Sequence, residues 1–403
     1  MIELAAIEQA ERTIREHILA TPLIYSPTLS HTFNAHIYLK LENLQKTGSF
    51  KVRGATYKII TGRQKGLIST RGVVAASAGN HAQGVALAAR QAGLPATIVM
   101  PEWSSISKRE ATRSYGGNVV IYGATVEECL TEAKSIAGQG AAFIHPFDDR
   151  EIITGQATIG LEIISALPDA DVILVPVGGG GLIAGIASSV KALNHRARII
   201  GVEAAVCPSA QAALRAGKCV AVASKPSLAD GINVKQIGQE PLQIMRSLVD
   251  DVVSVAEEDI AASIQLLLER KHVLSEGAGA VPLAALLSGI FRPQSGEKVV
   301  LLISGGNVDS PLLGRIIQRG LLKNRRILRL RLTLIDKPGN LARLLSIIAE
   351  LQANILHIHH DRSPQNCSIE ETIVELELET RNQEHIDAIT CTLRKADYNV
   401  ILP

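Results

Sequence analysis

The chain has 403 residues, of which 46% are hydrophobic, 20% are charged and 33 are glycine. This composition is typical of a folded protein with many turns, and the length predicts two or three domains instead of one core. The net charge of +2, from 41 basic and 39 acidic residues, gives no reason to expect nucleic acid or an anionic membrane as a partner.

Strand-like and helix-like segments alternate from about residue 73 to about residue 320. Short runs rich in Val and Ile, each ending in Gly, Ser or Pro, are followed by segments with helical periodicity. This alternation predicts repeated βα units and parallel sheets, which bind ligands at the carboxyl ends of their strands. The expected strands cover residues 73–77, 96–101, 118–123, 171–177, 197–203 and 299–306.

The last eighty or so residues follow a different pattern. Leucines alternate with arginines and a threonine over 328–334, which predicts a half-buried strand, and the basic residues of 323–331 are expected on its solvent face and in a linker. A helix after Pro338-Gly339, two more alternating strands, a second helix and a final strand complete the order β-α-β-β-α-β of a ferredoxin-like module. We expect the domain boundary near 320–326.

The cysteines and the N-terminus bear on where the protein resides. The segment 1–18 is amphipathic and charged throughout, unlike a signal peptide, and no apolar run is long enough to span a bilayer. We therefore expect a cytoplasmic protein. The cysteines are dispersed without a C-x-x-C pair, which is typical of reduced thiols: Cys129, Cys207, Cys219, Cys367 and Cys391.

Four clusters carry residue types suited to chemistry. Lys51 follows Thr47-Gly48-Ser49-Phe50, and in isolation it would be an ordinary surface lysine at a helix start. SAGNHAQG (77–84) offers small residues, an amide and backbone N–H groups at a strand-to-helix turn. GGGGLIAG (178–185) follows an apolar strand and opens a helix, where backbone N–H groups can bind an anion. SGGN (304–307) ends the last strand of the series.

The second glycine cluster also fits another interpretation. Gly179-x-Gly181-x-x-Ala184 follows a strand and opens a helix, and Glu203 lies 22 residues further on. This is the pattern of a dinucleotide-binding fingerprint. It leaves Lys51, Asn80 and the SGGN cluster unexplained and lies in the middle of the chain, so it is the less favoured interpretation.

The motifs, taken in order, resemble the threonine/serine dehydratase group of fold-type-II pyridoxal-phosphate enzymes across essentially residues 1–320. The resemblance implies an α/β fold with two doubly wound parallel-sheet domains of the tryptophan synthase β type, and a smaller subdomain at about 40–145. The tail at 326–403 resembles a single ACT domain, a small-molecule-sensing module, through IDKPGNLARLLSIIAE and ANIL. The motifs are TGSFKVRGA, SAGNHAQG, MPE, KREATRSYG, PVGGGGLIAG, ADGI, EGAGA and ISGGN.

By this resemblance the protein is a lyase that binds pyridoxal 5'-phosphate. It would convert L-threonine to 2-oxobutanoate and ammonia by β-elimination, act also on L-serine, and serve isoleucine biosynthesis or threonine catabolism. Lys51 would bind the cofactor through its amine and then take the Cα proton, with a pKa lowered by burial. The cofactor phosphate would lie on the glycine loop, which has no basic residue, and would protonate the departing hydroxyl.

The resemblance also implies which residues contact the ligands. Asn80 matches the residue that hydrogen-bonds the ring hydroxyl oxygen, and Ser304 the residue that faces the pyridine nitrogen. The implied cofactor-binding residues are Phe50, Lys51, Asn80, Gly178, Gly179, Gly180, Gly181, Leu182 and Ser304, and the implied substrate-binding residues are Ser77, Ala78, Gly79, Asn80 and His81.

Two of these positions narrow the reaction. A hydroxyl at Ser304 cannot hold the ring nitrogen protonated as an aspartate would, so β-elimination competes well with transamination. Ala78 stands where eukaryotic-type serine racemases carry a second serine as acid–base, which disfavours racemisation. A serine dehydratase or serine racemase of the same fold remains an alternative. So does a non-catalytic amino-acid sensor, although the intact Lys51 argues against it.

A metal site is not firmly expected. The related racemases hold a divalent metal with a Glu and, six residues on, an Asp; here Glu203 is present, but Ser209 stands at the second position. Glu203 is therefore a candidate only for a minor cation site, with the Cys207 carbonyl. His357 and His359 share one strand face, which we interpret as a solvent or interface face in preference to a metal site.

The ACT resemblance implies an effector site between paired modules. Isoleucine is the leading effector and valine a counter-effector, and the pairing implies a homo-oligomer, a homotetramer or a homodimer. The implied effector residues are Asp336, Gly339, Asn340 and Leu341, facing Asn354 and Ile355 of a partner.

Overall fold

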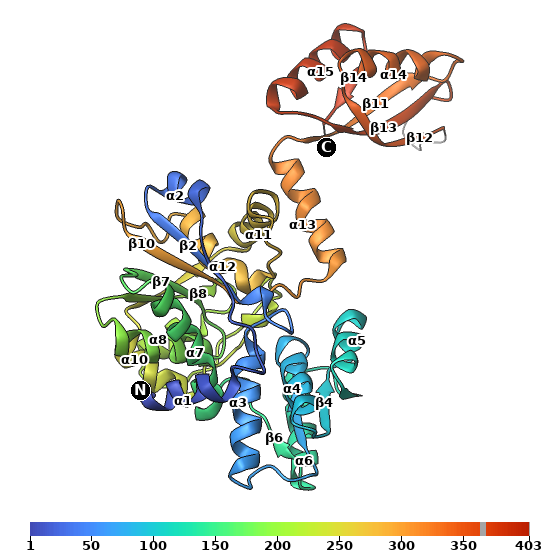
Figure 1. Cartoon of the computed structure of the whole chain (residues 1–403). Helices are drawn as coiled ribbons and strands as arrows, with labels where there is room; N and C mark the ends of the chain where they lie inside the picture. The colour runs from blue at the N-terminus through green and yellow to red at the C-terminus, as the bar shows by residue number, and fades with distance from the viewer. Residues whose placement is uncertain (363–367, 403) are drawn as a thin grey trace. The chain divides into compact units, whose positions relative to one another are not determined.

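The computed structural model of the protein describes residues 1–362 and 368–402 (Figure 1). The chain forms two compact units, Met1–Ser310 and Pro311–Pro403, which are described separately. Helix α13 (Ser310–Lys323) begins at the last residue of the first unit and continues in the second. The boundary expected near 320–326 stays a prediction.

The larger sheet of the first unit has six strands in the order β1-β2-β10-β7-β8-β9. Only β1 pairs in the antiparallel sense, with β2. The inner strands are almost fully buried because helices α7 and α8 pack on one face and α12 on the other. The strands are β1 (Leu23–Tyr25), β2 (His36–Leu41), β7 (Val172–Pro176), β8 (Arg198–Ala204), β9 (Asp251–Val255) and β10 (Lys298–Ile303).

The smaller sheet has four parallel strands in the order β5-β4-β3-β6. Alternate residues of β3 enter two separate cores: Val73 and Ala75 pack against α3 and α4, whereas Val74 and Ala76 pack against α6. The sheet is therefore covered on both faces, as a parallel sheet requires. The strands are β3 (Val73–Ala76), β4 (Ala96–Met100), β5 (Gly117–Ile121) and β6 (Ala142–Phe143).

Helix α3 joins the two halves of this unit. It packs on α4 beside the small sheet and on α7 beside the large one, as Figure 1 shows for α3, α4 and α7. The contact with α7 is close because glycines meet there: a Cβ on Gly155 would lie 2.6 Å from Cα of Gly54. The helices are α1 (Leu4–Ile14), α2 (Pro27–Phe33), α3 (Lys51–Gln64), α4 (Asn80–Gln91), α5 (Ile106–Ser114), α6 (Val126–Gly138), α7 (Arg150–Ala166), α8 (Gly181–Leu193), α9 (Ser209–Ala216), α10 (Gln239–Leu248), α11 (Glu257–Lys271) and α12 (Gly277–Leu287), with 3-10 turns at Glu42–Leu44 and Asp230–Ile232.

The second unit is an antiparallel sheet in the order β12-β13-β11-β14 with two helices. The element order is the β-α-β-β-α-β that the sequence predicts. Leu328, Leu330 and Leu332 of β11 are buried, and Arg329 and Arg331 on its other face pair with glutamates of β13. The elements are β11 (Ile327–Ile335), α14 (Asn340–Glu350), β12 (Asn354–Asp361), β13 (Glu371–Glu379), α15 (Gln383–Lys395) and β14 (Asn399–Ile401).

The predicted α/β class with parallel sheets is confirmed, and each of the six expected strands is present, with ends that differ by at most three residues. Sequence analysis did not find β1, β2, β6 or β9. Cys367 lies outside the described residues, and the other four cysteines are free. None of the described helices combines the length and apolar character needed to cross a bilayer.

Candidate active site

A cavity of about 800 Å³ receives the carboxyl ends of β3, β7 and β10, and residues of both sheets line it. It brings together all of the candidate cofactor- and substrate-binding residues, although they come from four separate segments of the sequence. The candidates among its lining residues are Phe50, Lys51, Ser77, Ala78, Gly79, Asn80, His81, Gly178, Gly179, Gly180, Gly181, Leu182 and Ser304.

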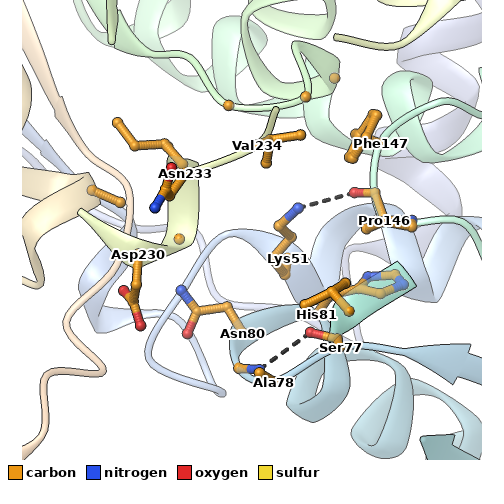
Figure 2. A pocket seen from close by; sticks show the side chains of 18 of the residues that line it. Lys51, Ser77, Ala78, Asn80, His81, Pro146, Phe147, Asp230, Asn233 and Val234 are labelled. Carbon is orange, nitrogen blue, oxygen red and sulfur yellow. Dashed lines mark hydrogen bonds between the residues drawn. The ribbon is translucent and has the colours of Figure 1, made fainter. Parts of the chain in front are cut away.

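Lys51 is the first residue of α3, and its amine lies inside the cavity (Figure 2). Nζ donates a hydrogen bond to the backbone O of Pro146 at 2.9 Å and lies 5.2 Å from the centre of the Phe50 ring. Burial lowers the pKa of Lys51 to about 8, and nearby Glu276 opposes this shift. A lysine with this pKa has a substantial neutral fraction near pH 7–8, so it can act as a nucleophile or a base.

The glycine loop connects β7 to α8. Gly180 has φ +89°, in the left-handed region that glycine favours, and it caps α8 without a side-chain hydrogen bond. A Cβ on Gly179 would lie 2.2 Å from the ring of Phe147, so a side chain at this position would displace that ring. The free N–H groups of the first turn of α8 therefore lie at the cavity wall, an arrangement that suits a phosphate.

The loop Ser77–Gly79 connects β3 to α4. The N–H of Gly79 donates to Ser77 Oγ at 3.2 Å, and no side chain caps the first turn of α4. Nε2 of His81 contacts the backbone O of Ile144 at 2.9 Å, and burial lowers the pKa of His81 to about 3, so its ring is neutral. This contact occupies the imidazole outside the loop. The contribution of His81 to the cavity is therefore mainly its position in the first turn of α4. Helix N-termini attract carboxylates.

Ser304 and Asn233 add polar groups to the wall of the cavity. Ser304 directly follows β10 and is 2% exposed, and its backbone O accepts from the N–H of Phe50 at 3.1 Å, which ties the strand end to the lysine segment. Asn233 Oδ1 is buried and has no hydrogen-bond partner among the described residues. A reactive amine, a cradle of N–H groups and an unpartnered polar atom fit a ligand with a phosphate, an aldehyde and ring polar atoms.

The cavity rim carries ion pairs that the sequence analysis did not find. Lys108 Nζ of α5 contacts Asp230 Oδ2 at 2.7 Å, and Lys235 Nζ contacts Glu127 Oε1 of α6 at 3.1 Å. Each pair connects the small-sheet half to the large-sheet half. Lys108 and Asp230 belong to the motifs KREATRSYG and ADGI. The sequence therefore pointed to both residues but not to the contact between them. Exposed Trp103 also lines the cavity and donates its indole N–H to the backbone O of Ala124.

Glu276 is a further site residue that sequence reasoning missed, although its motif EGAGA was recognised. It lines the cavity, is 5% exposed and accepts a hydrogen bond from Asn80 Nδ2 at 2.6 Å. Burial is the main reason that its pKa is raised to about 7.

The residues considered for metal binding do not gather around a common point. The carboxylate of Glu203 is buried at the end of β8 and accepts from the N–H groups of Ala210 (2.9 Å) and Gln211 (3.2 Å) at the start of α9. Burial raises the pKa of Glu203 to about 7. In the described part of the chain, no group of three or more His, Cys, Asp or Glu side chains is placed to hold a metal ion; this includes His357 and His359 of β12.

The candidate effector residues lie in two places on the second unit. Asp336, Gly339, Asn340 and Leu341 occupy the connection from β11 into α14, with Gly339 at φ +92°. Asn354 and Ile355 begin β12, and Asn354 is in register with Glu379, whereas the β11 end at Ile335 is in register with Glu371. The two groups are thus at opposite ends of the sheet within one chain.

Comparisons with known proteins agree with this geometry. A family model described as pyridoxal-phosphate dependent enzyme matches residues 14–305. The L-threonine ammonia-lyase of Thermotoga maritima is 47% identical over 401 residues, 99% of each chain. Among solved structures, a threonine deaminase from T.th. is 39% identical with a TM-score of 0.71, and the match covers 76% of this chain and 99% of that one. Maize serine racemase is 34% identical with a TM-score of 0.74, covering 80% and 99%.

Proposed function

The chain belongs to the pyridoxal-phosphate dependent enzymes, and from this premise we propose that it removes water and ammonia from L-threonine to form 2-oxobutanoate, with L-serine as a second substrate. The observation that carries the proposal is the Lys51 amine, which has a lowered pKa and shares one cavity with the glycine loop and Ser304. The names of the relatives, an L-threonine ammonia-lyase and a threonine deaminase, support the choice of substrate.

The cavity residues suit the parts of the cofactor in a defined way. Gly178–Gly181 and Leu182 would hold the phosphate by backbone N–H groups, Asn80 the ring hydroxyl oxygen and Ser304 the ring nitrogen. When bound, pyridoxal phosphate supplies an aldehyde that takes the substrate amino group and a ring that withdraws electrons from Cα. A hydroxyl at Ser304 leaves the ring nitrogen less charged than a carboxylate would, which favours loss of the β-hydroxyl.

Lys51 is the proposed base. Its neutral form, accessible because burial lowers its pKa to about 8, takes the proton from Cα of the substrate. The carbonyl of Pro146 accepts an N–H of the amine and so directs its lone pair. Lys51 has the only ionisable side chain at the start of α3 that lines the cavity. The same amine would therefore bind the cofactor and deprotonate the substrate.

The substrate carboxylate would bind at the start of α4. The uncapped N–H groups there and the helix dipole attract an anion. Lys108 reinforces this attraction, because its Nζ would lie 4.0 Å from a Cβ on Gly79. The side chain of Ala78 has no acid–base group, so a proton returned to the second face of Cα, as racemisation needs, has no donor at position 78.

The test is turnover by the purified enzyme. We expect 2-oxobutanoate and ammonia from L-threonine, pyruvate and ammonia from L-serine, and a visible absorbance band that Lys51→Ala abolishes together with turnover. Lys65→Ala is the matched control, because Lys65 lies just past the other end of α3 and pairs with Glu151, and neither residue lines the cavity. This variant should keep both the absorbance band and turnover. Ammonia release by Lys51→Ala, or D-serine as the main product from L-serine, would overturn the proposal.

We further propose that the second unit is an ACT-type regulatory module in a homodimer or homotetramer. Because the two groups of candidate effector residues lie at opposite ends of one sheet, a site that joins Asn340 to Asn354 needs a second copy.

Isoleucine is the proposed inhibitor and valine its antagonist, which would place the enzyme in isoleucine synthesis. The free cysteines support a cytoplasmic location. Activity titrated with isoleucine, with alanine as control, tests the idea, and a flat response refutes it.

A further inference from the structure

Four segments that are far apart in the sequence meet in one hydrogen-bonded chain behind Asn80. Nδ2 of Asn307 donates to the backbone O of Thr47 at 2.8 Å and to Oδ1 of Asn80 at 2.7 Å. Nδ2 of Asn80 in turn donates to Oε1 of Glu276 at 2.6 Å. All four residues belong to motifs of the sequence, but the functional assignment uses only Asn80.

The hydrogen-bond acceptors around Asn307 fix the orientation of its side-chain amide. An asparagine amide has two N–H donors; besides a longer contact of Nδ2 with Gln83 Oε1 at 3.4 Å, Thr47 O and Asn80 Oδ1 take both. A flipped Asn307 would turn its oxygen toward these two acceptors, which would repel it. The amide is also confined by the backbone, since a Cβ on Gly48 would lie 2.4 Å from Asn307 Oδ1. Asn307 therefore presents a fixed donor to Asn80.

Glu276 fixes the other side of the Asn80 amide. Its carboxylate packs closely against the backbone at Gly305, because a Cβ there would lie 2.4 Å from Oε1. As an acceptor it selects the Nδ2 side of Asn80, and Asn307 as a donor selects the Oδ1 side. With one N–H engaged by Glu276, Asn80 keeps a second N–H, and Asn80 lines the cavity. A buried carboxylate is costly to maintain, which points to a functional role.

We propose that Glu276 and Asn307 are positioning residues, which hold the Asn80 amide so that its remaining N–H faces the ring oxygen of the cofactor. This inference rests on the proposed function, since that oxygen belongs to pyridoxal phosphate. Neither residue contacts the cofactor in this account, and both act through Asn80. The contribution of each to cofactor binding should therefore vanish when Asn80 has no amide.

A double-mutant cycle on the purified holoenzyme tests this dependence. Glu276→Gln keeps the shape of the side chain but weakens the acceptor, and Asn307→Ser removes the donor. Each is combined with Asn80→Ala. The dissociation constant for pyridoxal phosphate is measured by equilibrium dialysis, together with the position of the visible band of the bound cofactor. Thermal unfolding separates effects on folding from effects on binding.

We expect each single variant to weaken cofactor binding about 10-fold, the value of one hydrogen bond to a charged oxygen, and to shift the visible band. In the Asn80→Ala background the same substitutions should change the dissociation constant less than about twofold. Asn43→Ser is the matched control, because Asn43 donates to the backbone O of Leu274 outside the chain of hydrogen bonds; its cofactor affinity should equal that of the wild type.

Equal losses in both backgrounds would show that Glu276 and Asn307 act independently of Asn80 and would overturn the inference. Unchanged affinity and spectrum in both single variants would do the same. A wild-type protein that does not bind pyridoxal phosphate would refute the proposed function itself. A wild type that binds it and turns over L-threonine, but shows additive losses, refutes only the positioning role.

Discussion

Lys51 and Arg53 stand two residues apart at the start of α3, yet the charged groups of their side chains have different kinds of partner. Arg53 is fully buried and contacts Glu42 at 2.8 Å and Glu162 at 2.7 Å. Lys40 completes this buried ionic cluster through Glu162 at 2.5 Å. The amine of Lys51, in the cavity, donates instead to a backbone carbonyl.

The pKa values follow the same division. In the buried ionic cluster, burial raises the pKa of Glu42, but Arg53, Lys40 and Thr21 together hold it below its ordinary value. In the cavity, burial prevails: the pKa of Lys51 falls to about 8 and that of Glu276 rises to about 7. In the buried ionic cluster the charges are paired with one another, whereas in the cavity Lys51 and Glu276 remain available to a ligand. The comparison teaches that burial alone does not decide how a charge behaves; its partners do.

The largest effect should come from breaking the compensated region. Arg53→Met leaves buried Glu42 without its ion-pair partner and leaves Glu162 with Lys40 alone, and we expect a loss of about 3–5 kcal/mol in the free energy of unfolding. Lys51→Met removes a desolvated amine that has no carboxylate in hydrogen-bonding contact, so the stability of the cofactor-free protein should not fall. Urea unfolding of both variants measures the difference. Equal losses in the free energy of unfolding for the two variants would contradict the difference between the buried ionic cluster and the cavity.

A smaller effect should appear in the pH dependence of stability. The folded-state pKa of Glu276 is raised to about 7, above its ordinary 4.5, so its contribution to stability is fully present below about pH 4.5 and is lost as the pH rises to about 7. Without cofactor, Glu276→Gln should therefore gain stability relative to the wild type between pH 5 and pH 7. Burial and the charge of Asp230 raise the pKa, while Lys108 and Lys51 oppose this.

Glu42→Gln supplies the opposite case for the same measurement. Because the pKa of Glu42 is lowered, its stabilising contribution is present above about pH 4.5 and is lost only at lower pH. The difference from the wild type should therefore stay constant between pH 5 and pH 7. Buried His81 and half-buried His145 change stability in the other direction with pH, but they are common to all variants and cancel. A sloping difference for Glu42→Gln would contradict this account.

The smallest effect should come from an exposed pair in the second unit. Arg329 of β11 contacts Glu377 of β13 at 2.7 Å, and its side chain is 45% exposed. Solvent screens such pairs, so Arg329→Ala should cost about 0.2–1 kcal/mol, and less at high salt. Unfolding at two salt concentrations checks this. A loss as large as that of Arg53→Met would mean that burial is not what separates the two kinds of pair.

The sequence predicted what is local and missed what depends on distant packing. Three of the four recognised clusters are short segments at the ends of strands β3, β7 and β10, and the parallel sheets bring these ends into one cavity with the Lys51 cluster at the start of α3. The chain from Asn307 to Glu276, the Arg53 cluster and the Lys108–Asp230 pair join segments separated by up to 260 residues, so no local pattern reveals them. Strands β1 and β9 were missed because they have three and five residues and exposed positions that blur their pattern.

Trp103 gives the cavity a consequence of another kind. It is the only tryptophan among the 403 residues, and it lines the cavity beside the rim. Indole emission overlaps the absorption of pyridoxal compounds, so an occupied cavity should quench the intrinsic fluorescence of the whole protein by energy transfer. The enzyme thus contains its own optical reporter, and filling or emptying of the cavity can be followed in real time without a label.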